Sequence, residues 1–191
     1  MENSEKFNEE SALKVITEMI DATKNDVRSN YFFFLLWGFL VLAASLLEYC
    51  LLTFFHSPYH YIGWPVLMSI GMIVSLVYAI RKYSKTNSTT YIGNFFKFFF
   101  LAWSLSLILV LFFIIPRNNQ LVQPVILVMY AMAIFISGGI LRFMPLKWGG
   151  IIAWAAALLS FFSPFPVQLL ITAAAVVVAY IVPGFILKSR K

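Results

Sequence analysis

One long apolar run, from Tyr31 to Phe54, constrains this chain more than any other feature of its sequence. A single acidic residue, Glu48, interrupts the run. The hydrocarbon core of a bilayer is about 30 Å thick, so a helix that rises about 1.5 Å per residue needs about 20 apolar residues to cross it. The run is therefore long enough to be a membrane-spanning helix.

The composition extends this conclusion to the rest of the chain. Of the 191 residues, 61% are hydrophobic and only 12% are charged, whereas a soluble domain carries about 25% charged residues. Too few polar side chains remain to cover a water-exposed surface. In lipid, only helices and closed barrels satisfy every backbone polar group. Because the apolar runs are long and apolar on all sides, we predict an all-α, polytopic helical membrane protein.

The chain divides into a polar leader and a bundle. Residues 1–30 are expected to form a cytoplasmic amphipathic helix, and residues 31–191 a bundle of six transmembrane helices. With both termini in the cytoplasm, Arg117 is the single basic residue outside and the other 13 are inside, as the positive-inside rule requires. The predicted spans cover about residues 31–54, 62–80, 95–115, 121–141, 146–162 and 167–187.

The leader is acidic and amphipathic. It holds seven of the eight acidic residues and four basic ones, which gives it a net charge of −3. Leu13, Ile16 and Ile20 follow the spacing of one helix face. This face is a candidate docking surface for a cytoplasmic or membrane protein, with residues 1–28 as the docking segment. The alternative is a solvated helix that only steadies the first span.

Glu48 is the residue most suggestive of function, because a charged group inside hydrocarbon costs about 3 kcal/mol on insertion scales. It is a candidate coupling carboxylate of a small proton-coupled transporter. The alternative is an interfacial carboxylate that bonds to Tyr49, to a loop histidine or to lipid headgroups. His56 and His60 follow in a short connection and are its candidate polar partners. No fourth ligand accompanies these groups, so no metal site is predicted.

Small residues spaced four apart mark candidate faces for close helix packing. No span contains Arg or Asp, and Lys97 and Lys147 lie at the inner ends of their spans, which weakens the interpretation of the chain as an ion pump or channel. The candidate packing residues are Gly71 with Ser75, Ala102 with Ser106, and Ala133 with Ser137.

Motifs of other function classes are missing from the sequence. It has no HExxH, no Gly-x-Ser-x-Gly and no P-loop, and both histidines lie in one connection. We therefore expect no enzyme activity and no cofactor. Topology explains the basic residues, so no nucleic-acid partner is predicted. The expected partners are the lipid bilayer and a protein that docks on the leader, and a homo-oligomer stays open.

The joined leader and first span carry a resemblance. The segment Leu13-Lys14-Val15-Ile16-Thr17-Glu18-Met19-Ile20, followed by Phe34-Leu35-Leu36-Trp37-Gly38-Phe39, resembles a family of small bacterial multi-span integral membrane proteins of uncharacterised function. The resemblance covers about the first quarter of the chain. It implies a bacterial inner-membrane location and supplies no activity.

Two functions are therefore expected. The first is a non-enzymatic membrane module that acts through its acidic amphipathic helix. The alternative is a small proton-coupled secondary transporter or exporter that uses Glu48.

Overall fold

The computed structural model describes residues 31–83, 91–114 and 117–189, and within these residues every regular element is a helix. The all-α prediction is confirmed. The leader, including Leu13, Ile16 and Ile20, lies outside the described residues. The elements are α2 (Tyr31–Thr53), η1 (His60–Ile62), α3 (Gly63–Tyr83), α4 (Tyr91–Ile114), η2 (Asn119–Leu121), α5 (Val122–Ile140), α6 (Met144–Phe161), α7 (Phe165–Val176), η3 (Val177–Ile181) and α8 (Val182–Ser189).

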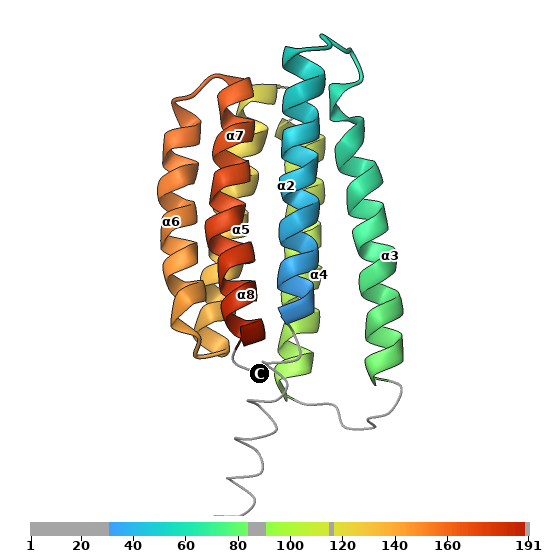
Figure 1. Ribbon diagram of the computed structural model, residues 1–191, viewed down its shortest axis with the longest axis vertical. Coiled ribbons are helices and arrows are strands. Elements are labelled where there is room, and N and C mark those ends of the chain that lie inside the picture. The colour runs from blue at the N-terminus through green and yellow to red at the C-terminus, as the bar shows by residue number, and fades with distance from the viewer. Residues whose placement is uncertain (1–30, 84–90, 115–116, 190–191) are drawn as a thin grey trace, which may run out of the picture.

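These elements form six long helical rods, namely α2, α3, α4, α5, α6 and the continuous α7–η3–α8. The rods run side by side with alternating directions (Figure 1). The last rod is continuous from α7 to α8, with a π-helical segment, η3, between them. Each predicted span coincides with a rod to within a few residues. Five helices are long and apolar enough to cross a membrane by length and composition, and the apolar helix Leu101–Ile114 within α4 is shorter. The architecture is that of a helical membrane protein.

The helices are unequally packed. The α5 helix packs closely on α6, and the α7–α8 rod packs on both α6 and α2; we call these four rods, α2, α5, α6 and α7–α8, the core helices. The α3 helix packs mainly on α2, and α4 packs mainly on α5. Large apolar side chains on both of these peripheral helices are exposed, among them Met72 on α3 and Phe112 on α4.

Glycine allows the closest approach, between α5 and α6. A methyl group placed on Gly138 would lie 2.7 Å from the amide nitrogen of Lys147, and one on Gly150 would lie 2.8 Å from Cβ of Phe135. Because interiors are already close-packed, no larger residue fits there without moving a backbone. The neighbouring Gly139 meets nothing within 4 Å.

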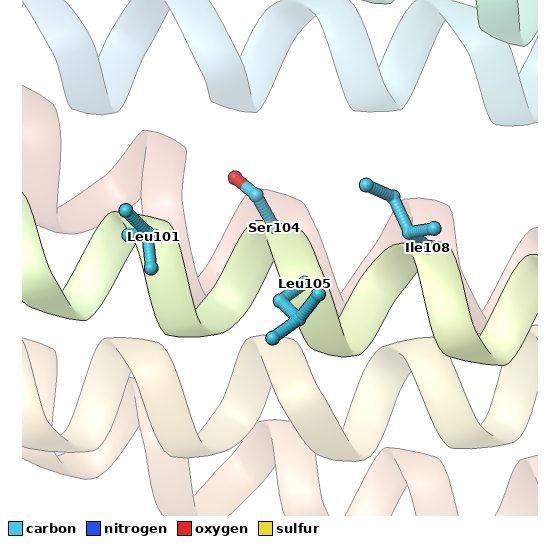
Figure 2. A pocket seen from close by; sticks show the side chains of 4 residues that line it. All are labelled: Leu101, Ser104, Leu105 and Ile108. Atoms are coloured by element: carbon cyan, nitrogen blue, oxygen red, sulfur yellow. The ribbon is translucent and has the colours of Figure 1, made fainter.

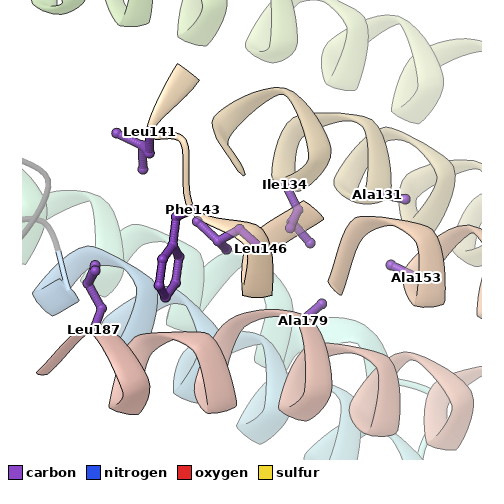
Figure 3. Packing of buried hydrophobic residues seen from close by; sticks show 8 residues of the cluster. All are labelled: Ala131, Ile134, Leu141, Phe143, Leu146, Ala153, Ala179 and Leu187. Carbon is purple, nitrogen blue, oxygen red and sulfur yellow. The ribbon is translucent and has the colours of Figure 1, made fainter. Parts of the chain in front are cut away.

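An apolar cluster closes the bundle at the end where α5 turns into α6 and α8 ends (Figure 3). Its residues come from three of the core rods and from the short α5–α6 connection, so burial at this end is entirely hydrophobic. The cluster consists of Ala131, Ile134, Leu141, Phe143, Leu146, Ala153, Ala179 and Leu187.

Some of the predicted packing residues are buried against a neighbouring helix and others are exposed. Gly71 is buried against α2, where an added methyl group would meet Leu40 and Trp37. Ala133 is buried in α5. The structure contradicts the prediction for Ala102 and Ser106, because both are exposed and the Ser106 hydroxyl donates to the Ala102 carbonyl, 2.9 Å away. That face of α4 points away from the core helices.

Ser75 and Ser137, the partners of Gly71 and Ala133 in the spacing pattern, are both half-buried. The Ser75 hydroxyl has no hydrogen-bond partner. Two of the three small-residue pairs therefore face a neighbouring helix, at least in part.

Candidate functional site

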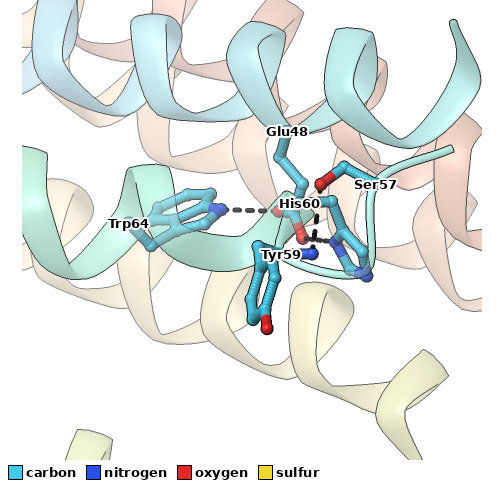
Figure 4. Close-up of polar contacts among 5 residues, drawn as sticks. All are labelled: Glu48, Ser57, Tyr59, His60 and Trp64. Atoms are coloured by element: carbon cyan, nitrogen blue, oxygen red, sulfur yellow. Dashed lines mark hydrogen bonds and ion pairs between the residues drawn. The ribbon is translucent and has the colours of Figure 1, made fainter. Parts of the chain in front are cut away.

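Glu48 lies near the end of α2 and is buried, with 3% of its surface exposed. Both carboxylate oxygens have partners (Figure 4). Oε1 is 2.8 Å from Nδ1 of His60 in η1, and Oε2 accepts a hydrogen bond of 2.6 Å from Nε1 of Trp64 in α3. The carboxylate therefore joins α2 to the start of α3.

The α2–α3 connection places these partners. The Ser57 amide donates to the Leu51 carbonyl, and the Ser57 hydroxyl accepts from the Tyr59 amide at 3.2 Å. These bonds turn the chain back beside α2. His60 and Trp64 are four residues apart, a spacing that puts two side chains on the same face of a helical segment. Both therefore face Glu48.

The sequence prediction of a loop-histidine partner for Glu48 agrees with this geometry for His60. His56 is exposed, has a positive φ of 48°, and does not reach the carboxylate. Trp64 was not predicted, although its spacing from His60 was a usable signal. Among the described residues, no three His, Cys, Asp or Glu side chains come together as metal ligands.

Trp64 also belongs to an aromatic cluster at the centre of the bundle. The ring centroids of Trp103 and Tyr130 are 5.6 Å apart, and those of Tyr130 and Tyr180 are 6.0 Å apart. Val41, Val176, Met68 and Ile126 pack around these rings. We call Trp64, Trp103, Tyr130 and Tyr180 the central aromatic cluster. Since Trp64 bonds to Glu48, the carboxylate lies at one edge of it.

Two features distinguish this cluster from a core of regular, fully hydrogen-bonded helices. The indole nitrogen of Trp103 is buried without a hydrogen-bond partner, although buried indole N–H groups usually have one. Tyr180 lies in the π-helical segment η3, and π-bulges frequently occur at functional sites. Both features lie where α4 and α7–α8 face the centre.

A shallow groove follows α4 beside the cluster. Figure 2 shows Ser104 and Ile108 pointing toward the neighbouring α2 ribbon. The groove is open along its length, and Leu101 on its wall is 63% exposed. It is lined by Leu101, Ser104, Leu105 and Ile108.

The remaining buried polar side chains lie at the same end as Glu48. Gln168 donates from Nε2 to the Ser163 carbonyl at 3.0 Å, and its Oε1 has no partner. Thr172 donates to its own helix through the Gln168 carbonyl at 2.9 Å. Sequence reasoning did not select these groups because uncharged polar residues are common in spans. They are Ser45, Gln123, Ser160, Gln168 and Thr172.

Comparison with known proteins adds no assignment to this geometry. No family model matches the chain, and neither a curated protein nor a solved structure is similar to it. The site is therefore interpreted from its own chemistry.

Proposed function

We propose that this protein is a small proton-coupled secondary transporter in which Glu48 is the coupling carboxylate. One observation carries the proposal: the only acid outside residues 1–30 is buried in a span, at the edge of an aromatic cluster beside a lateral groove. Ionisable residues within spans often mark substrate and proton pathways. The proposal includes no catalysed reaction and no cofactor.

The hydrogen bonds of Glu48 suggest how a proton would be coupled to movement. The ionised carboxylate accepts from both His60 and Trp64. A protonated carboxyl group has one hydroxyl that donates, so it accepts less well. Protonation of Oε2 would therefore break the bond from Trp64, whose indole N–H can only donate, and so weaken the attachment of α3 to α2. A substrate that competes with the proton would have the opposite effect.

We also propose a bacterial cytoplasmic-membrane location with both termini in the cytoplasm. Arg81 lies near the end of α3, Arg142 lies in the α5–α6 connection, Lys147 lies near the start of α6 and Lys188 lies near the end of α8, whereas Arg117 follows the end of α4. Because successive helices alternate in direction (Figure 1), Arg117 is on the opposite side of the bundle from the other four, which supports this orientation. In a Cys50→Ser background, Asn118→Cys should react with a membrane-impermeant maleimide on intact cells. Ser189→Cys should react only after permeabilisation. The reverse pattern would invert the orientation.

The test of the transporter is carbodiimide labelling of Glu48 in lipid nanodiscs, followed by mass spectrometry. Carbodiimides react with the protonated acid, so labelling should increase as the solution is acidified and should disappear in Glu48→Gln. Proteoliposomes with a pH gradient should then accumulate or release solutes only when Glu48 is present. Labelling that does not respond to pH, together with flux unchanged in Glu48→Gln, would refute the coupling role.

A second candidate function is the non-enzymatic interaction module. The observation that favours it is charge: residues 1–30, with a net charge of −3, join α2 at the end where Arg81 and Lys188 lie. A partner, or the basic end itself, would bind this leader. Deletion of residues 1–28 should abolish partner crosslinking and leave Glu48 labelling intact. Loss of flux with unchanged crosslinking would argue against the module.

A further inference from the structure

We propose that Glu48 and the central aromatic cluster together form a binding site for a hydrophobic organic cation that enters from the bilayer through the groove on α4. The inference rests on the proposed function and names its substrate class. Three observations support it: the charge at the site, the aromatic surface beside that charge, and the way in which α4 is attached.

The charge of the site favours a cation. Glu48 is the only acid among the described residues, and the Lys and Arg residues of the described chain lie toward the ends of the helices. The other titratable groups that face the site are His60 from η1, Tyr130 from α5 and Tyr180 from η3. A buried carboxylate attracts a cation strongly where the effective dielectric constant is low.

The aromatic rings supply the second part of the recognition. A cation over the face of Trp or Tyr, within about 6 Å of the ring centroid, is attracted by the ring quadrupole, and Trp gives the strongest attraction. The cluster contains two Trp and two Tyr rings; Trp64 bonds to Glu48 and packs, as Trp103 and Tyr180 do, against the buried residues Val41, Tyr130 and Val176. An organic cation with apolar substituents would therefore find its counter-ion and its packing surface together.

The limited packing of α4 gives a ligand access to the central aromatic cluster. Among the described residues, α4 packs extensively only on α5, so it reaches α2 and α3 through side chains such as Trp103. Rotation of Trp103 would open the cluster to the groove at Ser104, and its unpartnered indole nitrogen loses no hydrogen bond by moving. A lipid-soluble cation can reach this opening sideways, without crossing a water-filled pore.

The test uses tetraphenylphosphonium as the probe and tetraphenylborate as an anion of matched size. Binding to the full-length protein in nanodiscs is measured by equilibrium dialysis. After subtraction of binding to protein-free nanodiscs, we expect the cation to bind and the anion to bind at least 10-fold more weakly. Equal binding of the two ions would overturn the inference without any mutant, so the result does not depend on a variant that folds.

Variants then locate the site. Glu48→Gln should weaken tetraphenylphosphonium binding at least 10-fold, and Trp103→Leu several-fold. Trp148→Phe is the matched control, since Trp148 is 63% exposed on α6 and lies outside the cluster, and it should leave binding unchanged. Unchanged affinity in both site variants would refute the location.

This experiment separates the two proposals. If neither ion binds while carbodiimide labelling of Glu48 still depends on pH and is blocked by another solute, the cation site is wrong and the transporter stands. If labelling does not respond to pH and the cation does not bind, both proposals fail.

Discussion

The core helices and the two peripheral helices of this bundle are all apolar but packed in different ways. Between α5 and α6, glycines bring the backbones together and leave no room for a methyl group. Around α3 and α4, large side chains such as Met68 and Trp103 span the distance instead. Small residues at an interface give rigid contacts in lipid, whereas long side chains can change rotamer. The core helices are therefore suited to be the scaffold, and α3 and α4 to be the parts that move.

The largest expected effect tests the scaffold. Gly138→Leu should destabilise the protein by about 3 kcal/mol, because its side chain has to displace the α6 backbone near Lys147. The thermal midpoint in detergent checks this. Gly139→Leu is the matched control, since nothing lies within 4 Å of that position, and it should shift stability by no more than about 0.5 kcal/mol. Equal effects at the two positions would contradict the close contact.

A smaller effect is expected within α5. Ala133→Leu adds bulk at a buried position of a core helix and should cost about 2 kcal/mol. Denaturant or thermal unfolding in detergent measures it. A cost near zero would show that this face of α5 tolerates extra volume, and the contrast between the core and peripheral helices would then be weaker.

The attachment of α3 is tested by the two histidines. His60→Ala removes one donor from the buried Glu48 carboxylate and should cost about 1–2 kcal/mol. It should also increase proteolysis in the α2–α3 connection. His56→Asn changes an exposed residue with positive φ, a conformation that Asn tolerates, so its thermal midpoint should match that of the unaltered chain. Equal losses in both variants would contradict the pairing.

The smallest effect is expected on the exposed face of α4. Ala102→Leu should change the free energy of unfolding of the monomer, obtained from its thermal midpoint, by less than about 0.5 kcal/mol, because the residue faces away from the core helices. A larger loss, accompanied by a change in the mass measured by light scattering, would show that a second copy covers this face.

Much of the fold could be predicted from residue types alone. The six predicted spans match the six rods to within a few residues. A loop histidine was one of the predicted alternatives for the partner of Glu48. The choice between His56 and His60 was not predictable, because it depends on how Ser57 and Tyr59 turn the chain. Aromatic residues make up 18% of the chain, so nothing in the sequence distinguished Trp64 and Trp103 from the others.

The sequence by itself determined that the chain is helical and, to within a few residues, which ranges form its long helices, because hydrocarbon requires every backbone group to bond within its own segment. Only the tertiary structure decided which side of each helix is buried. In a soluble protein, polar residues mark the exposed face, but in lipid both faces are apolar. The outward position of Ala102, the inward position of Ala133 and the meeting of Trp64 with Glu48 therefore depended on how the helices pack against one another.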